Sequence, residues 1–570
     1  MIKEKTIQEI DQLIKLWNKP DSPGCALGII KDGKFICKKG YGMADLEHDI
    51  PITPQTKFYI GSNSKQFTAM CILLLVEQNR ISLDDDIRKY LPKFPNYDQS
   101  ITIRNLIHHT SGIRCHKQLF VLAGKITGEE LISRQDSINI IYKQKELNFN
   151  PGTSFLYSTS NYFLLATIIK NVTGKSVKKF AEKYIFKPLN MKSTHYQDNN
   201  KDIINNRAFC YVPDGFQKKI PKEKGFFNYF IYHDGSSSGG GGVFTTIEDY
   251  FLWDQNFHAN KLGKSDQSLI YTMITPGRLK NEKETGYAFG LMIDKYKDQK
   301  RIWHVGGKGG YRAVYFSFPE LKLSIIMLCN CSSIDEQSLA LQISDIFLEN
   351  ILKTANKNHE KTSTNLETSK VSVDLKILKK YAGVYISEPL GMIRISIENG
   401  RLMFQDDGPK MELIPESVTS FFLKAYNMRL NFEKDESGKY SQFALYQQGN
   451  NTMIKTTSSE FDDLLQDGRN LIKRTFYGDG KMPKNELKQF EGTYYNEEVD
   501  ASHKLLTESN TLFIYGGSKY VLKFPLTFWK KDAFLTPFYS LKFQRTENGV
   551  IEAYKLDTSQ AKNLWFTKIS

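Results

Sequence analysis

The chain has 570 residues, which exceeds the size at which one hydrophobic core stops growing, so several domains are expected. Its hydrophobic fraction of 40% and aromatic fraction of 13% exclude a disordered chain and favour a globular protein with substantial β content. The net charge of +14 comes from lysines scattered along the chain, without an arginine-rich stripe or RNA-binding signature, so no nucleic-acid partner is expected.

The cysteines and the first residues bear on cofactors and location. The number of cysteines, seven, is odd and no Cys-x-x-Cys pair occurs, so neither a disulfide framework nor a zinc site is expected. Residues 1–17 combine charged side chains with spaced Ile and Leu, which predicts an amphipathic helix and no secretory leader. The longest apolar run, Ala69 to Val76, is too short to cross a bilayer. These patterns predict a cytoplasmic protein with no membrane span, no metal and no cofactor; export stays open for the case that a leader has been trimmed from the sequence.

The larger N-terminal part mixes helices with strands. An Asp32-Gly33 turn between residues 25–30 and 34–38 predicts a β-hairpin. Further along, the pattern of apolar residues predicts two helices, two adjacent strands and a closing helix, in this order: 64–78, 161–172, 314–318, 323–329 and 339–352. Helices mixed with an antiparallel sheet predict the α+β class.

A sequence repeat follows a polar linker. The stretch Leu378 to Tyr385 matches Leu487 to Tyr494, and later landmarks keep nearly the same offset: Leu402 with Leu512, Pro415 with Pro525, Phe432 with Phe543, and Gly438 with Gly549. Each copy consists of short alternating segments, such as 430–432 and 443–446, between Gly, Asn and Asp turns, which is typical of an antiparallel barrel or sandwich. Two similar β domains are therefore expected.

These patterns divide the chain into three domains. Residues 353–370 carry almost no apolar anchor, so they cannot bury themselves and predict a linker. The expected organisation is a first domain, a linker, a β-barrel domain, a second linker and a second β-barrel domain: 1–355, 356–372, 373–460, 461–483 and 484–570.

Ser62-Asn63-Ser64-Lys65 stands directly before the first predicted helix. If the helix begins there, Ser62 and Lys65 lie one turn apart on the same face, where a neutral amine can take the hydroxyl proton during attack. Burial and the positive helix end both lower a lysine pKa, and the same backbone N–H groups can hold an oxyanion. The pattern alone is weak, because Ser176 with Lys179 and Ser559 with Lys562 also fit it.

Four further motifs accompany Ser62 in a fixed order: residues 101–112 (ITIRNLIHHTSG), Tyr157-Ser158-Thr159, the glycine run 237–246, and His304-Val305-Gly306. Their order and spacing resemble the superfamily of serine β-lactamases and penicillin-binding proteins. It includes the class C β-lactamases, the D-aminopeptidases and the CubicO esterase and peptidase group. The resemblance covers about residues 7 to 352.

The resemblance implies a β-lactamase-like α/β sandwich, with an antiparallel sheet beside an all-helical subdomain and the active site between them. It implies Ser62 as the nucleophile, Lys65 as its base and Tyr157 as a proton shuttle to the leaving group, although either of the last two can be the base. A catalytic domain followed by two β domains also resembles the layout of D-aminopeptidases. The two tail domains are expected to be lipocalin-like barrels.

The same resemblance implies the substrate-facing wall and the oxyanion hole. The strand bearing His304 and Gly306 would line the wall opposite Ser62, with His304 in place of the lysine of the penicillin-binding pattern. The backbone N–H groups of Ser62 and Gly307 are the candidates for the oxyanion hole.

Two positions depart from the pattern. Thr159 stands where family members usually carry Asn, and one hydroxyl cannot offer the two-ended hydrogen bonding of an amide. His304 is expected to be neutral near pH 7, so it attracts a substrate carboxylate less than lysine does. Both departures shift the expectation toward ester, small amide or short peptide substrates, turned over by a D-aminopeptidase-like or esterase-like serine hydrolase.

Other functions stay open on the sequence. They are a sensor or binding protein that recognises penicillin without turnover, a true β-lactamase or D,D-peptidase, and a carbohydrate or lipid carrier built on the tail domains. Self-association into a homo-oligomer is also open. Residues 236–242 and Gly174-Lys175-Ser176 both lack the full pattern of a phosphate-binding loop. His108 and His109 lack a third metal ligand, so a structural role is expected, with His109 hydrogen-bonded in a turn.

Overall fold

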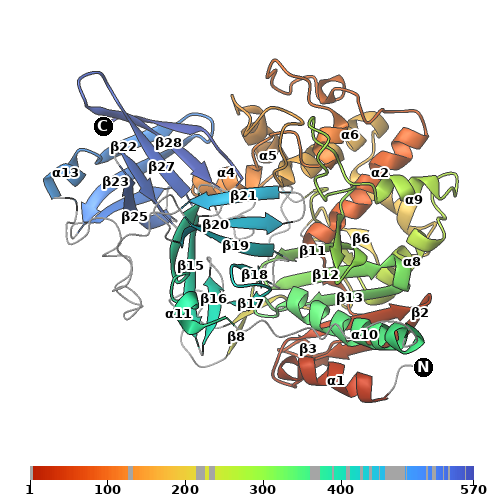
Figure 1. Ribbon diagram of the computed structural model, residues 1–570. Coiled ribbons are helices and arrows are strands. Elements are labelled where there is room, and N and C mark those ends of the chain that lie inside the picture. Colours follow the sequence, from red (N-terminus) through yellow and green to blue (C-terminus); the bar gives the residue numbers. More distant parts are fainter. Residues whose placement is uncertain are drawn as a thin grey trace. The chain divides into compact units, whose positions relative to one another are not determined.

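The computed structural model of the protein contains two compact units (Figure 1). Unit 1 comprises Met1–Ile113, Thr127–Tyr142 and Phe149–Asn365, and unit 2 comprises Arg114–Ile126, Lys143–Asn148 and Leu366–Ser570. The structure describes the following residues: 4–125, 132–199, 201–213, 225–229, 238–359, 373–387, 391–398, 400–405, 411–423, 428–434, 440–447, 450–455, 482, 484–508, 511–516, 522–530, 532–536, 539–558 and 560–570.

A six-stranded antiparallel sheet with the order β10-β11-β12-β13-β1-β2 forms the centre of unit 1. Its strands are β1 (Cys25–Lys31), β2 (Lys34–Tyr41), β10 (Met292–Tyr296), β11 (Gln299–Lys308), β12 (Tyr311–Phe318) and β13 (Leu323–Cys329). Cys25 in β1 lies opposite Cys329 in β13, so the first and last long strands of the unit share one sheet. The predicted hairpin and the two predicted adjacent strands are confirmed, as is the predicted fold class.

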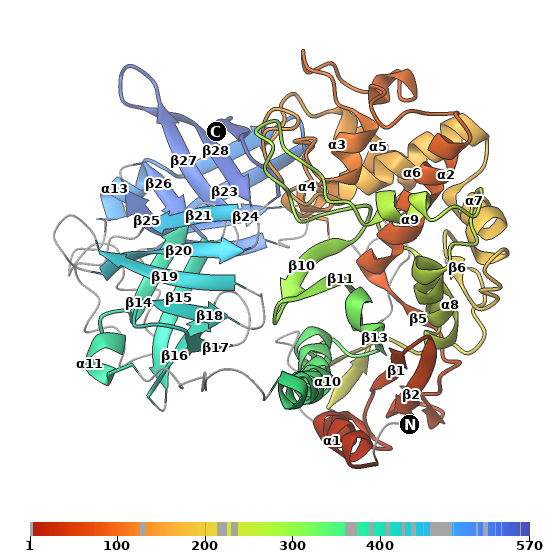
Figure 2. The same ribbon diagram turned by 45° about the vertical axis from the view of Figure 1, so that its right-hand side comes forward.

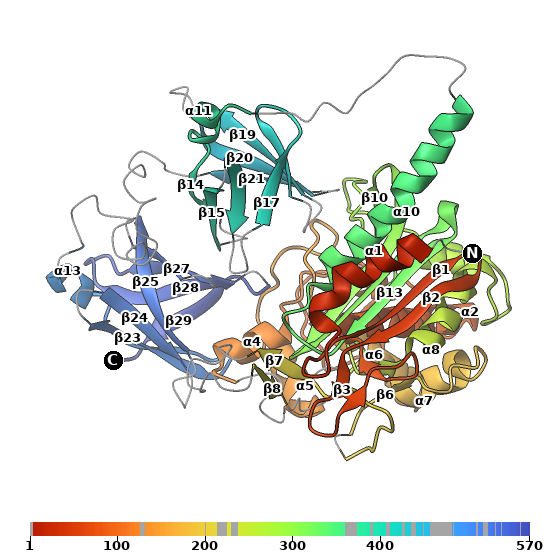
Figure 3. The same ribbon diagram turned by 90° about the horizontal axis from the view of Figure 1, so that it is seen from below.

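Helices cover both faces of this sheet (Figures 2 and 3). On one face, α10 (Glu336–His359) packs on β12 and β13, and α1 (Glu4–Ile14) lies beside α10. On the other face, α8 (Ile247–His258) contacts β1 and β13. The predicted closing helix, α10, continues beyond 352 to His359. Residues 356–359, which the sequence predicts as part of the linker, are therefore helical. The linker residues 360–372 lie outside the described residues.

The helical part of unit 1 is built around α2 (Lys65–Glu77), which packs on α6 (Thr159–Thr173) and α7 (Val177–Ala181). The predictions of helices at 64–78 and 161–172 are confirmed. The other helices are α3 (Ile103–Ile107), α5 (Arg134–Tyr142) and α9 (Ser268–Met273). Short strands complete the unit: β3 (Met43–Asp45), β4 (Ile50–Pro51), β5 (Phe58–Tyr59), β6 (His195–Tyr196), β7 (Tyr211–Pro213), β8 (Phe226–Asn228) and β9 (Val243–Thr245).

Two sets of antiparallel strands make up most of unit 2. The first, preceded by α11 (Leu375–Leu378), is an eight-stranded sheet of β14 (Gly383–Ser387), β15 (Gly391–Glu398), β16 (Arg401–Gln405), β17 (Met411–Pro415), β18 (Ser420–Leu423), β19 (Met428–Lys434), β20 (Tyr440–Gln447) and β21 (Asn450–Lys455). The second, preceded by α13 (Lys484–Lys488), is a closed barrel of β22 (Gly492–Asn496), β23 (Ala501–Glu508), β24 (Thr511–Gly516), β25 (Leu522–Lys530), β26 (Ala533–Leu535), β27 (Tyr539–Arg545), β28 (Ile551–Thr558) and β29 (Leu564–Lys568). Helix α4 (His116–Leu122) belongs to the same unit.

The sequence repeat corresponds to a structural one. The Tyr385 hydroxyl donates to the carbonyl of Tyr381 at 2.7 Å, and the matching Tyr494 hydroxyl donates to the carbonyl of Phe490 at 2.9 Å. In each copy this bond joins the first strand to the turn that follows the preceding short helix. Barrel-like sheets are therefore confirmed in the tail, while the lipocalin-like label stays a prediction. Gly438 and the second linker, apart from Met482, lie outside the described residues.

Aromatic side chains fill the interior of the closed barrel. The ring of Phe543 lies 6.1 Å from that of Tyr494 and 5.4 Å from that of Tyr554, and Phe566 stacks on Tyr554 at 5.1 Å. These four side chains are all buried. Because packed rings occupy this space, the barrel resembles a structural core more than the cavity of a small-molecule carrier.

None of the helices in the part of the chain that the structure describes combines the length and apolar character that a bilayer crossing requires. All seven cysteines are buried free thiols.

Candidate active site

Ser62 lies in a single 3₁₀ turn, Gly61–Ser64, that leads directly into α2. The turn is fixed on two sides. The Asn63 amide donates to the carbonyl of Ala313 in β12 at 3.1 Å, and the Ser64 hydroxyl accepts from the N–H of Val243 at 3.1 Å. The serine is therefore held between the central sheet and the start of a buried helix, with its own side chain only half-buried.

Lys65, the first residue of α2, directs its amine back toward Ser62. Its Nζ lies 2.9 Å from Ser62 Oγ and 2.8 Å from the carbonyl oxygen of Gly240. The lysine side chain is fully buried. The structure thus brings together the two residues that the sequence predicted as nucleophile and base, and an amine in this place can accept the hydroxyl proton.

Gly240 shows what the glycine run contributes. A β-carbon on Gly240 would lie 2.6 Å from Thr159 Cγ2 and 3.7 Å from Lys65 Nζ. Only a glycine allows the backbone carbonyl to reach the buried amine here. Ser236 and Ser237, at the start of the same run, lie outside the described residues.

Tyr157 joins the same cluster from the loop that precedes α6. The Lys65 amine lies 4.9 Å from the centre of the Tyr157 ring. That ring lies 4.3 Å from the ring of His109 and 6.2 Å from the ring of His304. Tyr157 as a whole is half-buried, like Ser62, but its hydroxyl oxygen is itself buried.

His109 holds the segment that carries Tyr157. Its backbone carbonyl accepts from the N–H of Leu156 at 2.9 Å, and its Nδ1 accepts from the N–H of Ser158 at 3.3 Å. The amide of Asn161 donates to the same Nδ1 at 3.0 Å. The backbone at His109 has φ 56°, in the left-handed region. The residue therefore clamps both neighbours of Tyr157, and the expected turn hydrogen bond is part of a larger arrangement.

Both imidazoles beside the lysine are held neutral. Burial, and then the positive charge of Lys65, lower the pKa of His109 well below its ordinary value. The same two causes lower the pKa of His304 to about 3. A buried imidazolium would lose its hydration, and it would meet like charge whenever Lys65 is protonated, so the neutral ring is favoured.

His304 lies in β11 and is oriented by two hydrogen bonds. Its Nδ1 donates to the carbonyl of Val305, since a carbonyl can only accept, so in the neutral ring Nε2 accepts from the Tyr287 hydroxyl at 3.2 Å. The side chain is buried. It therefore lines the cluster as a neutral, immobilised ring.

Gly306 and Gly307 bring β11 against the serine turn. A β-carbon on Gly306 would lie 2.7 Å from the N–H nitrogen of Ser62, and one on Gly61 would overlap Gly307 N. The N–H groups of Ser62 and Gly307, the predicted oxyanion-hole pair, thus lie at the same crossing of two backbones. Gly306 is buried, whereas Gly307 is exposed.

Thr159 is the first residue of α6 and is 9% exposed. Its methyl group faces the Gly240 backbone. The structure therefore places Thr159 next to the lysine-binding glycine, in the same cluster as the other predicted residues.

Sequence reasoning missed one contributor entirely. Tyr287 lies in a loop before β10, outside every recognised motif, yet its carbonyl accepts from His108 Nδ1 at 3.0 Å and its hydroxyl reaches His304. Gly290 in the same loop would place a β-carbon 2.6 Å from the N–H nitrogen of Gln66 in α2. No local sequence signal marks Tyr287, because its partners are distant in the chain. Among the described residues, no group of three His, Cys, Asp or Glu side chains could hold a metal ion.

Comparisons with known proteins agree with this geometry. Residues 5–345 match the family model described as Beta-lactamase, and residues 367–464 match a Domain of unknown function (DUF3471). Penicillin-binding protein 4* of Bacillus subtilis (strain 168) is 28% identical over 425 residues, which are 73% of this chain and 91% of that protein. Protein flp of Staphylococcus aureus (strain MRSA252) is 30% identical over 342 residues, covering 57% of this chain and 63% of that protein.

Two solved structures share the fold. The octameric penicillin-binding protein homologue from Pyrococcus abyssi aligns with a TM-score of 0.52 at 23% identity, covering 80% of this chain and all (100%) of that one. The D-amino acid amidase from Ochrobactrum anthropi SV3, complexed with L-phenylalanine, aligns with a TM-score of 0.52 at 20% identity, covering 62% of this chain and 100% of that one.

Proposed function

We propose, on the premise that the chain belongs to the beta-lactamase family of serine hydrolases, that it hydrolyses small esters or amides through an acyl-enzyme at Ser62. The resemblance predicted from the motifs is confirmed by the family match over residues 5–345. The contact that carries the proposal is the 2.9 Å hydrogen bond between Lys65 Nζ and Ser62 Oγ.

In the proposed acylation step, the neutral Lys65 amine takes the proton of Ser62 as Oγ attacks the substrate carbonyl carbon. The electron pair of the C=O bond moves to oxygen, and the N–H groups of Ser62 and Gly307 donate hydrogen bonds to the resulting oxyanion. When the carbonyl re-forms, the bond to the leaving alcohol or amine breaks. The proton passes from Lys65, through the Tyr157 phenol, to the leaving group, which restores the neutral amine.

Deacylation repeats the same steps with water. Lys65, or Tyr157 after it has passed its own proton to Lys65, takes a proton from water, the hydroxide oxygen adds to the acyl carbonyl, and the bond to Ser62 breaks as Oγ takes that proton. The 4.9 Å separation of the Lys65 amine from the Tyr157 ring centre supports a shared role in both half-reactions. Because two interacting groups share their protons, the role of base in each step is assigned to the pair of Lys65 and Tyr157 and not to one residue.

The substrate side of the proposal rests on His304 and Thr159. A histidine whose pKa is lowered to about 3 carries no positive charge at neutral pH, so this wall offers a substrate carboxylate no ion pair. Thr159 offers one hydroxyl in place of two-ended amide recognition. We therefore propose esters and small amides without a carboxylate, including amides of D-amino acids, as the substrate class.

The test uses the purified full chain. A fluorophosphonate probe is expected to label the wild type and to leave Ser62→Ala unlabelled, and p-nitrophenyl esters and D-amino acid amides are expected to release product with multiple turnovers. Lys65→Ala should lower the rate of acylation by at least about a hundredfold, as expected for the loss of a general base. An unlabelled wild type with no turnover on any ester, amide or β-lactam would overturn the proposal.

A second candidate is a penicillin-recognising protein that acylates without releasing product, and Thr159 is the observation that favours it. Penicillin would then form a stable adduct on Ser62 while product release from esters stays stoichiometric with enzyme. A burst of one equivalent followed by steady release supports the hydrolase, and a burst alone supports the sensor.

A further inference from the structure

The two segments that carry His109 and Tyr157 are hydrogen-bonded to each other within unit 1. The carbonyl of Thr110 accepts from the N–H of Gly152 at 2.8 Å, in addition to the bond between His109 and Leu156. Yet the chain leaves unit 1 directly after Ile113, returns to it over Thr127–Tyr142, leaves it again and re-enters it at Phe149. The residues beyond both points, Arg114–Ile126 and Lys143–Asn148, belong to the same compact unit as the second barrel.

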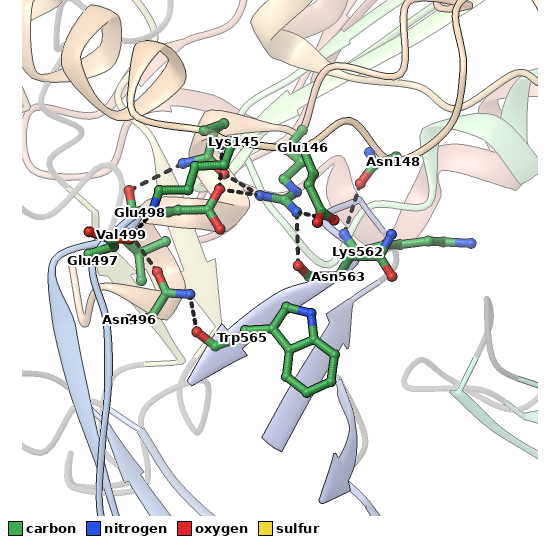
Figure 4. A network of polar contacts seen from close by, with 12 residues as sticks. Lys145, Glu146, Asn148, Asn496, Glu497, Glu498, Val499, Lys562, Asn563 and Trp565 are labelled. Atoms are coloured by element: carbon green, nitrogen blue, oxygen red, sulfur yellow. Dashed lines mark hydrogen bonds and ion pairs between the residues drawn. The ribbon is translucent and has the colours of Figure 1, made fainter. Parts of the chain in front are cut away.

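A buried ion pair holds both of these segments to the barrel. The Arg114 guanidinium donates to the Glu498 carboxylate at 2.7 Å, with side-chain exposures of 0% and 9%. The same guanidinium donates to Gln144 Oε1 and to the carbonyl of Asn563, both at 2.9 Å. Glu498 also accepts from the N–H of Lys145 at 2.7 Å, so one carboxylate of the barrel binds both segments (Figure 4).

A loop of the same barrel, residues 560–563, repeats this double attachment. The carbonyl of Gln560 accepts from the N–H of Cys115 at 3.1 Å and from the Asn148 amide at 3.3 Å. The Asn148 side-chain oxygen in turn accepts from the N–H of Lys562 at 2.8 Å (Figure 4). The loop therefore binds Cys115, two positions after Ile113, and Asn148, which directly precedes Phe149.

Helix α4 supplies a third attachment. Since a carbonyl can only accept, His503 Nε2 donates to the carbonyl of Leu122 at 3.0 Å, and Nδ1 then accepts from the Tyr554 hydroxyl at 2.7 Å. Both the histidine and the tyrosine are buried inside the barrel wall. The barrel thus recognises α4 through a neutral imidazole that its own core orients.

We propose that the second barrel is a positioning element for the Ser62 site. Glu498 and the loop 560–563 fix the two points where the His109 and Tyr157 segments leave unit 1, and the hydrogen bonds between these segments carry that constraint to the Tyr157 phenol. The inference rests on the proposed function, because its effect is exerted on the Ser62 reaction. Arg114 and Glu498 are positioning residues, since the proposal has them act on the Ser62 site through other residues.

The test compares matched variants of the full chain. Glu498→Gln removes the carboxylate charge that pairs with Arg114 and keeps the shape of the side chain. Asn148→Ala removes two hydrogen bonds and leaves no buried charge, so it serves as the second variant if Glu498→Gln fails to fold. The control is Asp532→Asn in the same barrel. Asp532 pairs with Arg545, with Arg545 Nε 2.9 Å from Asp532 Oδ1, and no described contact of its side chain reaches Arg114–Ile126 or Lys143–Asn148.

Three readouts separate positioning from general destabilisation: Tm, kcat and KM on a p-nitrophenyl ester, and amide hydrogen exchange of peptides covering 108–112 and 150–158. At a temperature where all variants are folded, Glu498→Gln and Asn148→Ala should each lower kcat about tenfold to a hundredfold with KM little changed. A displacement of about an ångström in the groups near the reacting atoms costs that much in rate. Exchange in both peptides should rise. Asp532→Asn should change neither, even where it lowers Tm by a similar amount.

The outcomes also separate this inference from the proposed function. Wild-type exchange and kcat in Glu498→Gln and Asn148→Ala, or an equal loss in Asp532→Asn, would overturn the positioning role while leaving the hydrolase intact. If the wild type shows no turnover, the hydrolase fails, and the exchange data alone then decide whether the barrel fixes these two segments.

Discussion

Replacing Gly306 by alanine should disable the site without touching any reactive side chain. The new β-carbon would lie 2.7 Å from the nitrogen of Ser62 and 3.0 Å from that of Asn63, and closer still to the carbonyl oxygen of Ile60. All three are backbone atoms of the serine turn or of the residue before it, so no flexible side chain can move aside. Restoring ordinary contact distances requires β11 and the turn to separate by roughly an ångström, a shift that costs about a hundredfold in rate.

Gly307 provides the matched control on the same strand. An alanine there would meet Arg312 Nη1 and the carbonyl of Tyr311, both at 3.1 Å, a contact that small shifts relieve. Gly306→Ala should therefore lower kcat/KM for an ester by about a hundredfold, or about 2.7 kcal/mol, whereas Gly307→Ala should lose less than about tenfold. Steady-state kinetics and the rate of fluorophosphonate labelling measure both effects. Equal activities of the two variants would refute the argument that the two backbones cross without room for a β-carbon.

Three further outcomes are expected. Tyr157→Phe should lower kcat by about a hundredfold with KM nearly unchanged, because it removes a proton shuttle and keeps the ring; unchanged turnover of p-nitrophenyl esters and amides would exclude that role. His109→Ala should lower kcat by about tenfold, and His109→Asn should recover part of the loss, since Asn tolerates the φ of 56° and offers an acceptor for Ser158 and Asn161; equal losses would argue against the clamp. The third concerns pH. Burial lowers the pKa of His108 and of His503 to about 4, and that of His304 to about 3, against an ordinary value of 6.5. The unfolded chain therefore takes up protons below about pH 6.5 that the folded protein refuses, so this contribution to stability is complete above pH 6.5 and is lost as pH falls toward 4. Tm should fall between pH 7 and pH 5, and His503→Gln should show a smaller fall; a Tm independent of pH would contradict the buried neutral state.

The sequence predicted the features that depend on contacts between residues close together in the chain. Ser62 and Lys65 could be paired in advance because a helical turn fixes residues three apart, and the structure places their side chains 2.9 Å apart. The hairpin around Asp32-Gly33 depended on local turn chemistry in the same way. Strands 323–329 and helices 64–78 and 161–172 were marked by their own apolar patterns, so these elements lie within a residue or two of their predicted bounds.

The parts that sequence could not supply depend on pairings between distant residues. Tyr287 orients His304 and His108 from a loop with no motif, and nothing in residues 284–291 indicates that the backbone returns to the start of α2. The contact between Arg114 and the second barrel could not be predicted for the same reason, since its partner Glu498 is 384 positions away. A pattern of single residues cannot encode such a pair without a second sequence to compare.

The arrangement around Lys65 also explains how two histidines can line a serine hydrolase site without acting as its base. Burial makes each imidazole a poor proton acceptor, and Lys65 opposes protonation further whenever its amine carries a proton, so the pKa of His109 and that of His304 both fall below the neutral range. Their nitrogens are also committed, Nδ1 of His109 to Ser158 and Asn161 and both nitrogens of His304 to Val305 and Tyr287. The two histidines therefore orient other groups. His109 fixes the segment that carries the Tyr157 phenol, and His304 fixes the facing wall. In the proposed mechanism, proton transfer is thereby left to the lysine, whose amine lies 2.9 Å from Ser62 Oγ, and to the phenol of Tyr157, whose ring lies beside that amine.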